Sequence, residues 1–71
     1  MIDTNRLKSY LVLRGKTLKS LAKEINMPIN TLSSKVNNIT EFKASEIVKI
    51  QIALDIPEQD VFKIFLRKEE K

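Results

Sequence analysis

The side chains of this sequence that are best suited to recognition chemistry are short amides and hydroxyls. Asn30, Thr31, Ser33 and Ser34 fall within five positions, and the surrounding stretch has one long charged side chain, Lys35. Such groups can donate and accept hydrogen bonds at base edges in a DNA major groove, where asparagine can pair with adenine through two bonds. A solvated helix face usually carries Glu, Lys, Arg and Gln, because Ser, Asn and Thr form helices less well. The pattern therefore favours groove recognition over a neutral solvated face.

These residues lie in the second of two short segments that have helical spacing. The first segment, residues 18–25, has an apolar stripe and follows Thr17, a residue suited to an N-cap. Asn26 tolerates the left-handed conformation that ends a helix, and Pro28 suits the first turn of a new one. The chain is therefore predicted to turn sharply and to begin a second helix over residues 28–36.

The remaining segments also have helical spacing. Three further helices are predicted over about residues 4–14, 44–54 and 57–66. One glycine and two prolines in 71 residues favour helices joined by short turns over a sheet. We expect an all-α fold, a compact five-helix bundle that forms one domain over residues 1–66, with a charged, flexible tail at residues 67–71.

Composition argues against several functional classes. The sequence has no His and no Cys, so the commonest general base and two main metal ligands are missing. A single isolated glycine cannot build a phosphate-cradling loop. We therefore expect no catalytic residue, metal, cofactor or small-molecule substrate. The apolar runs are too short for a membrane span or a secretion signal, and the absence of cysteine suits a reducing cytoplasm, so we expect a cytoplasmic protein with no membrane partner.

Positive charge is concentrated in the first part of the chain. Residues 1–43 contain eight Lys and Arg against three Asp and Glu, whereas residues 44–71 contain five against six. Lys19 and Lys23 lie four positions apart, on the side of their helix opposite its apolar stripe. A basic surface attracts a polyanion without reading sequence. Charge alone, however, is equally typical of a solubilising surface.

The segment TLKSLAKEINMPINTLSSKVNN, residues 17–38, resembles the helix-turn-helix of the Cro/C1-type (XRE-like) phage repressors. The continuation TEFKASEIVKIQIALDIPEQDVFKIF, residues 40–65, is similar to the rest of the short phage-encoded members. The resemblance implies the lambda-repressor-like fold. Asn26 replaces the usual turn glycine, and Lys35 stands where the family has an apolar residue, so that Val36 takes over its packing role.

The resemblance also implies which residues meet DNA. Positions that approach bases are occupied by Pro28, Ile29, Asn30 and Ser34. Positions near the DNA backbone are occupied by Thr31, Lys35, Asn37, Asn38 and Lys43, to which we add Thr17, Lys19 and Lys23 from the preceding helix. We expect a Cro-like transcriptional repressor of a phage or prophage switch that binds double-stranded operator DNA in a bacterial host.

A second interpretation is an antirepressor, which would bind the cognate phage repressor protein and inactivate it. Such a protein could offer Ile29, Asn30 and Ser33 to a protein surface in place of a groove. The apolar residues Pro28 and Ile29, where relatives often have Gln or Ser, suit a protein partner, as does the lack of arginine in the third helix. The basic half of the chain suits DNA, although an acidic surface on a repressor would also attract it.

The sequence VFKIFL near the C-terminus has more apolar residues than one helix face can bury. One interpretation is a C-terminal helix packed deeply over the core. The other is a weak dimer seam formed by Phe62, Phe65 or Leu66, which would place two recognition helices about 34 Å apart on a palindromic operator. The pattern does not decide which of these side chains face outward.

Overall fold

The structure is a computed structural model that describes residues 1–66. In this range the chain forms five α-helices and no strand; the helices are α1 (Thr4–Leu13), α2 (Leu18–Glu24), α3 (Ile29–Val36), α4 (Ala44–Leu54) and α5 (Glu58–Phe65). The all-α prediction is confirmed, and each predicted helix boundary is within one residue of the observed one. The predicted tail, residues 67–71, lies outside the described residues.

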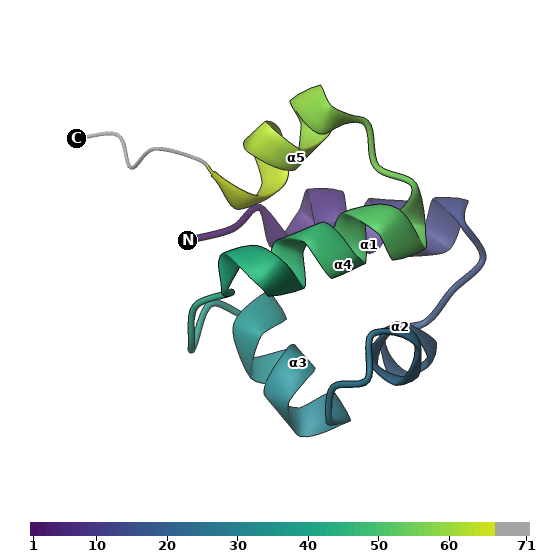
Figure 1. The fold of residues 1–71 in the computed structure, drawn as a ribbon, viewed down its shortest axis with the longest axis vertical. Helices are drawn as coiled ribbons and strands as arrows, with labels where there is room; N and C mark the ends of the chain where they lie inside the picture. The colour runs from purple at the N-terminus through teal and green to yellow at the C-terminus, as the bar shows by residue number, and fades with distance from the viewer. Residues whose placement is uncertain (67–71) are drawn as a thin grey trace.

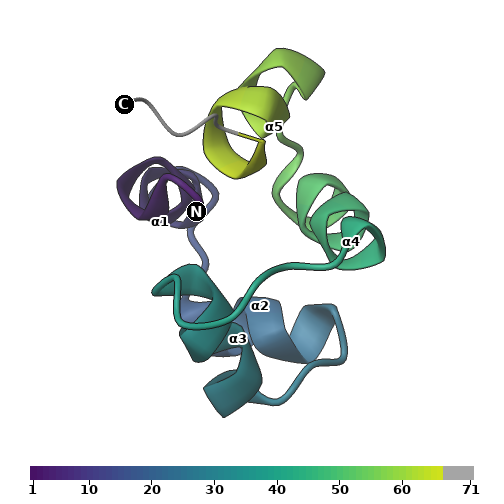
Figure 2. The ribbon, with the colours of Figure 1, turned by 90° about the vertical axis from the view of Figure 1, so that its left-hand side faces the viewer.

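The helices divide the molecule into two ends (Figures 1 and 2). α1 and α4 have roughly aligned axes and lie below α5, while α2 and α3 form the opposite end. Side chains from all five helices meet in one core between the two ends. The buried apolar residues are Ile2, Leu7, Leu11, Leu21, Ala22, Ile25, Leu32, Val36, Ile50, Leu54, Ile56, Val61, Ile64 and Phe65.

The first four helices all end in the same way. Gly15, Asn26, Asn38 and Asp55 follow helices α1 to α4 and have φ values of 67°, 59°, 64° and 50°. After each of them, the next residue donates its N–H to the carbonyl oxygen five residues earlier, at 2.8 to 3.0 Å. This is the Schellman arrangement, which satisfies carbonyl groups that the helix leaves free. The sequence predicted it at Gly15 and Asn26 and missed it at the other two positions.

Basic side chains from the end of α1 and the following loop hold the C-terminus of α4. Arg14 Nε and Nη2 donate to the carbonyl oxygens of Leu54 and Asp55, at 2.7 and 2.8 Å. Lys16 Nζ donates to the carbonyl oxygen of Ala53 at 2.8 Å. Cations at a helix C-terminus are also favoured by the helix dipole. Three successive carbonyl groups are thus held by the chain on either side of Gly15.

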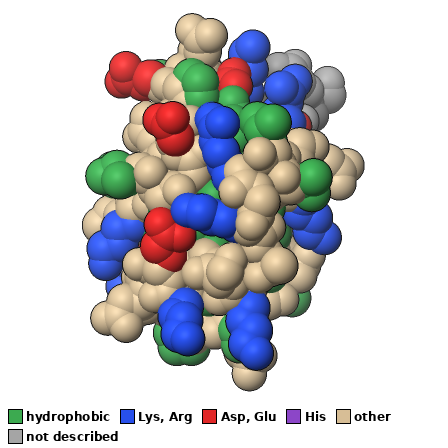
Figure 3. Space-filling model, turned by 90° about the vertical axis from the view of Figure 1, so that its right-hand side faces the viewer, with side chains coloured by type: hydrophobic (Ala, Val, Ile, Leu, Met, Phe, Trp, Pro, Cys, Tyr) green, Lys and Arg blue, Asp and Glu red, His purple; other side chains and the backbone are tan. Residues whose placement is uncertain are grey.

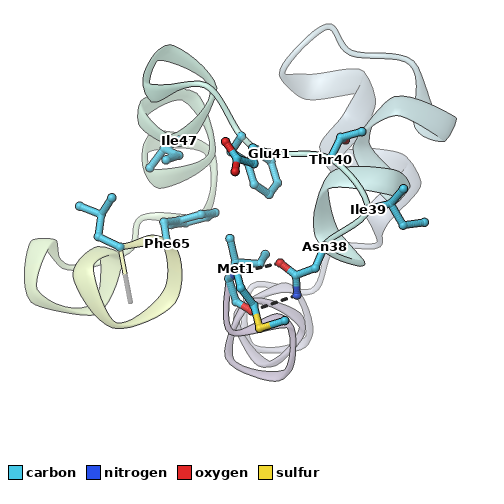
Figure 4. Close-up of a pocket in the computed structure, with 10 residues that line it drawn as sticks. Met1, Asn38, Ile39, Thr40, Glu41, Ile47 and Phe65 are labelled. Carbon is cyan, nitrogen blue, oxygen red and sulfur yellow. Dashed lines mark hydrogen bonds between the residues drawn. The ribbon is translucent and has the colours of Figure 1, made fainter. Parts of the chain in front are cut away.

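The first residues of the chain form an N-terminal clasp, residues 2–4, against the end of α3. Ile2 N donates to Asn38 Oδ1 at 2.7 Å, and Asn38 Nδ2 donates back to the Ile2 carbonyl oxygen at 3.2 Å (Figure 4). Thr4 Oγ1 donates to the carbonyl oxygen of Val36 at 2.7 Å. The clasp therefore fixes the C-terminal end of α3 to the start of α1.

The clasp also reaches α5, because Asp3 N donates to the carbonyl oxygen of Ile64 at 2.8 Å. Beside it lies a hollow of about 400 Å³ whose walls include Ile47 and Phe65 on one side and the N-terminal residues on the other (Figure 4). Phe42 packs edge-on against Phe65, with ring centroids 5.4 Å apart. The loop between α3 and α4 is in this way anchored on α5.

Candidate nucleic-acid interface

The turn between α2 and α3 is built by three residues with distinct roles. Asn26 adopts the left-handed conformation, and Met27 is half-buried against the core. Pro28 is the N-cap of α3, with φ −59° and ψ 141°, and so lies one residue before the helix. The chain therefore bends sharply at residues 26–28, as predicted, and α3 leaves the bend with its first turn exposed.

The N-terminus of α2 is closed by a reciprocal capping box. Thr17 Oγ1 accepts a hydrogen bond from Ser20 N at 3.1 Å, and Ser20 Oγ accepts one from Thr17 N at 2.9 Å. Such a box satisfies two backbone donors at the helix start. Lys19 and Lys23 lie on the exposed side of α2, which packs directly against α3.

α3 separates into a buried side and a polar outer side. Leu32 and Val36 are fully buried, but Val36 does not replace position 35 as predicted, because Lys35 is buried as well. Asn30 and Thr31 are exposed. The exposed side also includes Ile29, which is 39% exposed at the start of the helix. The outer surface of α3 is therefore formed chiefly by its first turn.

The other polar residues of α3 contribute less surface. Ser33 and Ser34 are half-buried. Ser33 Oγ accepts a hydrogen bond from Asn37 Nδ2 at 3.3 Å, although Asn37 itself is exposed. Neither serine is sealed inside the molecule, but the first turn of α3 is the more accessible part.

Exposed basic side chains, Lys19 and Lys23, lie at the end of the molecule that α2 and α3 form. On the face with the connection from α1 to α2, basic side chains lie near the tip of this end and an acidic side chain lies above them (Figure 3). Glu24, the last residue of α2, pairs with Lys16. Four of the eight Lys and Arg side chains in residues 1–43 bind groups of the chain itself. The other four are exposed and form no ion pair within residues 1–66; they are Lys8, Lys19, Lys23 and Lys43.

Residues 7–61 match a family model described as Helix-turn-helix (HTH_3). The chain belongs to this family of Cro/C1-type helix-turn-helix proteins. It is therefore a DNA-binding transcription regulator, of a family that is not enzymatic. No curated protein and no solved structure matches the chain. No helix within the described part of this helix-turn-helix protein is long and apolar enough to cross a membrane.

Lys35 does not occupy the exposed backbone-facing position predicted for it in this helix-turn-helix domain. The residue is only 8% exposed, and its Nζ lies 2.6 Å from Glu46 Oε1 in α4. Position 35, which is apolar in the family, faces inward in α3, so the Lys35 ammonium group forms an internal ion pair with Glu46. Glu46 was not predicted as a functional residue. The signal that could have identified it was a lysine at an apolar position, because a buried cation needs an acidic partner.

Two other predicted site residues are placed differently from expectation. The Asn38 amide binds Ile2 and, at 3.3 Å, Thr4 Oγ1, so its side chain is engaged within the helix-turn-helix domain and is not free for a phosphate. Phe65 is 6% exposed and belongs to the core, which excludes it from a dimer seam. Phe62 and Leu66 are 59% and 52% exposed. The C-terminal helix thus both covers the core and leaves two large apolar side chains outside.

Lys43 retains an exposed side chain at the N-cap of α4. Its backbone N–H donates to Glu46 Oε1 at 2.8 Å, so the same carboxylate oxygen binds both Lys35 and the start of α4. Burial alone would raise the pKa of Glu46, but the hydrogen bonds from Lys35 and Lys43 and their charges outweigh burial and lower this pKa. The carboxylate is therefore held in its ionised form.

Proposed function

We propose that the protein is a Cro-like repressor of a phage or prophage switch, which acts in the cytoplasm of a bacterial host and binds double-stranded operator DNA. The proposal rests on the exposure of Asn30 and Thr31 in the first turn of α3, directly after the bend at residues 26–28. An element that enters the major groove presents such short donors and acceptors from the N-terminal part of its recognition helix.

In this proposal the residues divide between base readout and attachment to the DNA backbone. Asn30 pairs with a base edge, and the exposed side of Ile29 contacts a thymine methyl group, with Pro28 beside it. Ser33 and Ser34 lie deeper and contact bases only at the edge of the interface. The DNA backbone is contacted by Thr17, Thr31 and Asn37 and by the free lysines Lys19, Lys23 and Lys43.

In the test, the wild-type protein first selects duplexes from a random-sequence pool. The affinity of each variant is then measured for the selected duplex and for a duplex of scrambled sequence. Asn30→Ala should lower the preference for the selected duplex by about 1–3 kcal/mol if its contact is bidentate. Lys19→Ala should weaken binding to both duplexes alike, because a phosphate contact reads no sequence. Lys63→Ala, an exposed lysine on α5, is the charge-matched control. A wild-type protein that enriches no sequence would refute the proposal.

Two observations favour an antirepressor as the second candidate function. Ile29 is exposed at the start of α3, and the sole cation of that helix, Lys35, is paired with Glu46. An outer face with an apolar residue and no free charge suits a protein surface. Asn30→Ala would then leave DNA affinity unchanged and abolish binding to the cognate repressor, measured by titrating one purified protein with the other.

We further propose a weak homodimer through α5, formed by Phe62 and Leu66, which are large, apolar and exposed. A two-fold dimer would present two copies of α3 to the two halves of a palindromic operator. Phe62→Ser should reduce the concentration-dependent increase in sedimentation coefficient. The same coefficient for the wild-type and variant proteins at every concentration would rule out this seam.

A further inference from the structure

The link between α3 and α4 depends on one carboxylate oxygen. Glu46 Oε1 accepts from Lys35 Nζ at 2.6 Å and from Lys43 N at 2.8 Å. It therefore joins the last turn of α3 to the first turn of α4 at a single point. Within residues 1–66, no other side-chain hydrogen bond or ion pair connects these two helices.

The rest of the contact between α3 and α4 is limited. α3 packs most extensively on α2, and its backbone approaches α4 much less closely. The connection between them, residues 37–43, has no helix of its own. The N-terminal clasp holds the C-terminal end of α3 against α1, and Leu32 and Val36 pack in the shared core. Neither contact sets a direction between α3 and the first turn of α4, whereas the short hydrogen bond between the charged groups of Lys35 and Glu46 joins these two turns and is directional.

Stability does not explain this pair. The Lys35 and Glu46 side chains are 10% and 16% exposed, so both charges have lost most of their water. A buried ion pair often stabilises a fold no better than apolar residues of similar volume. An apolar side chain at position 35 would bury the same stem without that loss, and what it could not supply is the directional bond between α3 and α4.

We propose that Lys35 and Glu46 are positioning residues, whose ion pair sets the angle of α3 relative to the start of α4. This rests on the proposed DNA-reading function, because the angle decides how Asn30 on α3 and Lys43 on α4 meet bases and backbone together. Neither Lys35 nor Glu46 touches DNA in this arrangement. The pair controls discrimination between sequences, and the free lysines supply the sequence-independent attraction.

The decisive variant is the double substitution Lys35→Met and Glu46→Gln. It removes both charges, so neither is left buried alone, and the glutamine amide oxygen can still accept from Lys43 N. We expect this variant to keep the melting temperature within a few degrees of wild type. Its preference for the selected duplex over the scrambled one should fall about tenfold or more, comparable to the loss of one base contact.

The matched control is Lys63→Met, which also removes a lysine but from an exposed position on α5. It should leave the affinity for both duplexes, and therefore their ratio, close to wild type, because α5 lies at the end of the molecule opposite α2 and α3 (Figure 1). If the double variant has the same ratio as this control, the pair is merely structural and the proposal is wrong. Lys35→Arg, made with Glu46 in place, should keep most of the preference that the double variant loses, because arginine can also pair with Glu46. If the role is merely structural, the double variant loses no preference.

A second measurement keeps the proposal separate from the proposed function. N–H residual dipolar couplings of the free protein report the angle between α3 and α4 without any DNA. The angle should differ from wild type in the double variant and be unchanged in Lys63→Met. An unchanged angle between α3 and α4 in the double variant refutes the positioning role, even if the variant still binds DNA. A wild-type protein that selects no sequence refutes the proposed function, and the angle then decides the positioning role by itself.

Discussion

The hydrogen bonds between Asn38 and the N-terminal clasp can be measured by a pair of matched glycine substitutions. Asn26 and Asn38 both follow a helix in the left-handed conformation, with φ 59° and 64°. Replacing either by glycine relieves the same backbone strain and adds the same freedom to the unfolded chain. Only Asn38 makes side-chain hydrogen bonds to a distant segment, namely to Ile2 and Thr4. The difference between the two variants therefore isolates those bonds.

The expected magnitude follows from the bonds that are lost. Asn38→Gly removes three hydrogen bonds, of 2.7, 3.2 and 3.3 Å. Each contributes about 0.5–1.5 kcal/mol net, and the bond to the partly buried Ile2 N–H is the costliest to lose because it leaves a donor unpaired. We expect Asn38→Gly to lower the free energy of unfolding by about 2 kcal/mol relative to Asn26→Gly.

Urea unfolding followed by far-ultraviolet circular dichroism measures this difference. With a slope of about 1 kcal/mol per molar urea for a protein this small, the midpoint of Asn38→Gly should lie about 2 M below that of Asn26→Gly. Asn38→Asp keeps the acceptor of Ile2 N and loses the amide donor, so its midpoint should be intermediate. Equal midpoints for the two glycine variants would show that the clasp contributes nothing to stability.

Three further predictions concern other polar groups of the fold. Arg14→Met should lower the free energy of unfolding by about 1–2 kcal/mol, because it leaves two carbonyl groups at the end of α4 without their donor. An equal loss for Arg6→Met, which removes a bond to the Asp3 side chain and none to α4, would refute this reasoning. The hydrogen bond from Tyr10 to Asp60 raises the pKa of Tyr10, and Asp60→Asn should bring it back toward 10; as Tyr10 is the sole tyrosine, absorbance at high pH reports it directly. Because the fold lowers the pKa of Glu46, the ionised carboxylate stabilises the fold at pH values above its ordinary pKa of 4.5, and this contribution is lost as pH falls through the folded-state pKa. The stability of Glu46→Gln should therefore depend less on pH below 4.5 than that of wild type, which thermal melts at successive pH values would show.

The helices and the bend could be predicted from sequence because their signals are local. Gly15, Asn26 and Pro28 act on their immediate neighbours, and helical spacing identifies which residues turn inward. The same local logic extends to Asn38, another asparagine directly after an apolar stripe. Its partner could not have been found, since Ile2 lies 36 residues away and offers only backbone groups that every residue has.

The candidate site was harder to predict because it depends on rotation and on distant partners. Lys35 was placed near the DNA backbone by the resemblance to the family, but its side chain is buried, with Glu46 of another helix as its partner. Among the apolar residues VFKIFL, the choice between core and surface depends on how α5 lies on α1 and α4. The structure buries Phe65 and exposes Phe62, a difference that one helix in isolation does not determine.

The basic side chains that hold the last turn of α4 also have a consequence for local motion. Helix ends normally fray, so their amide hydrogens exchange with solvent faster than those of the core. At this end, Asp55 and Ile56 donate to carbonyl groups inside α4, and the outer carbonyls are bound by Arg14 and Lys16. Fraying of this helix end therefore also has to break the hydrogen bonds from Arg14 and Lys16. The exchange of these two amides should therefore be slower than that of a helix end whose carbonyl groups have no such donors.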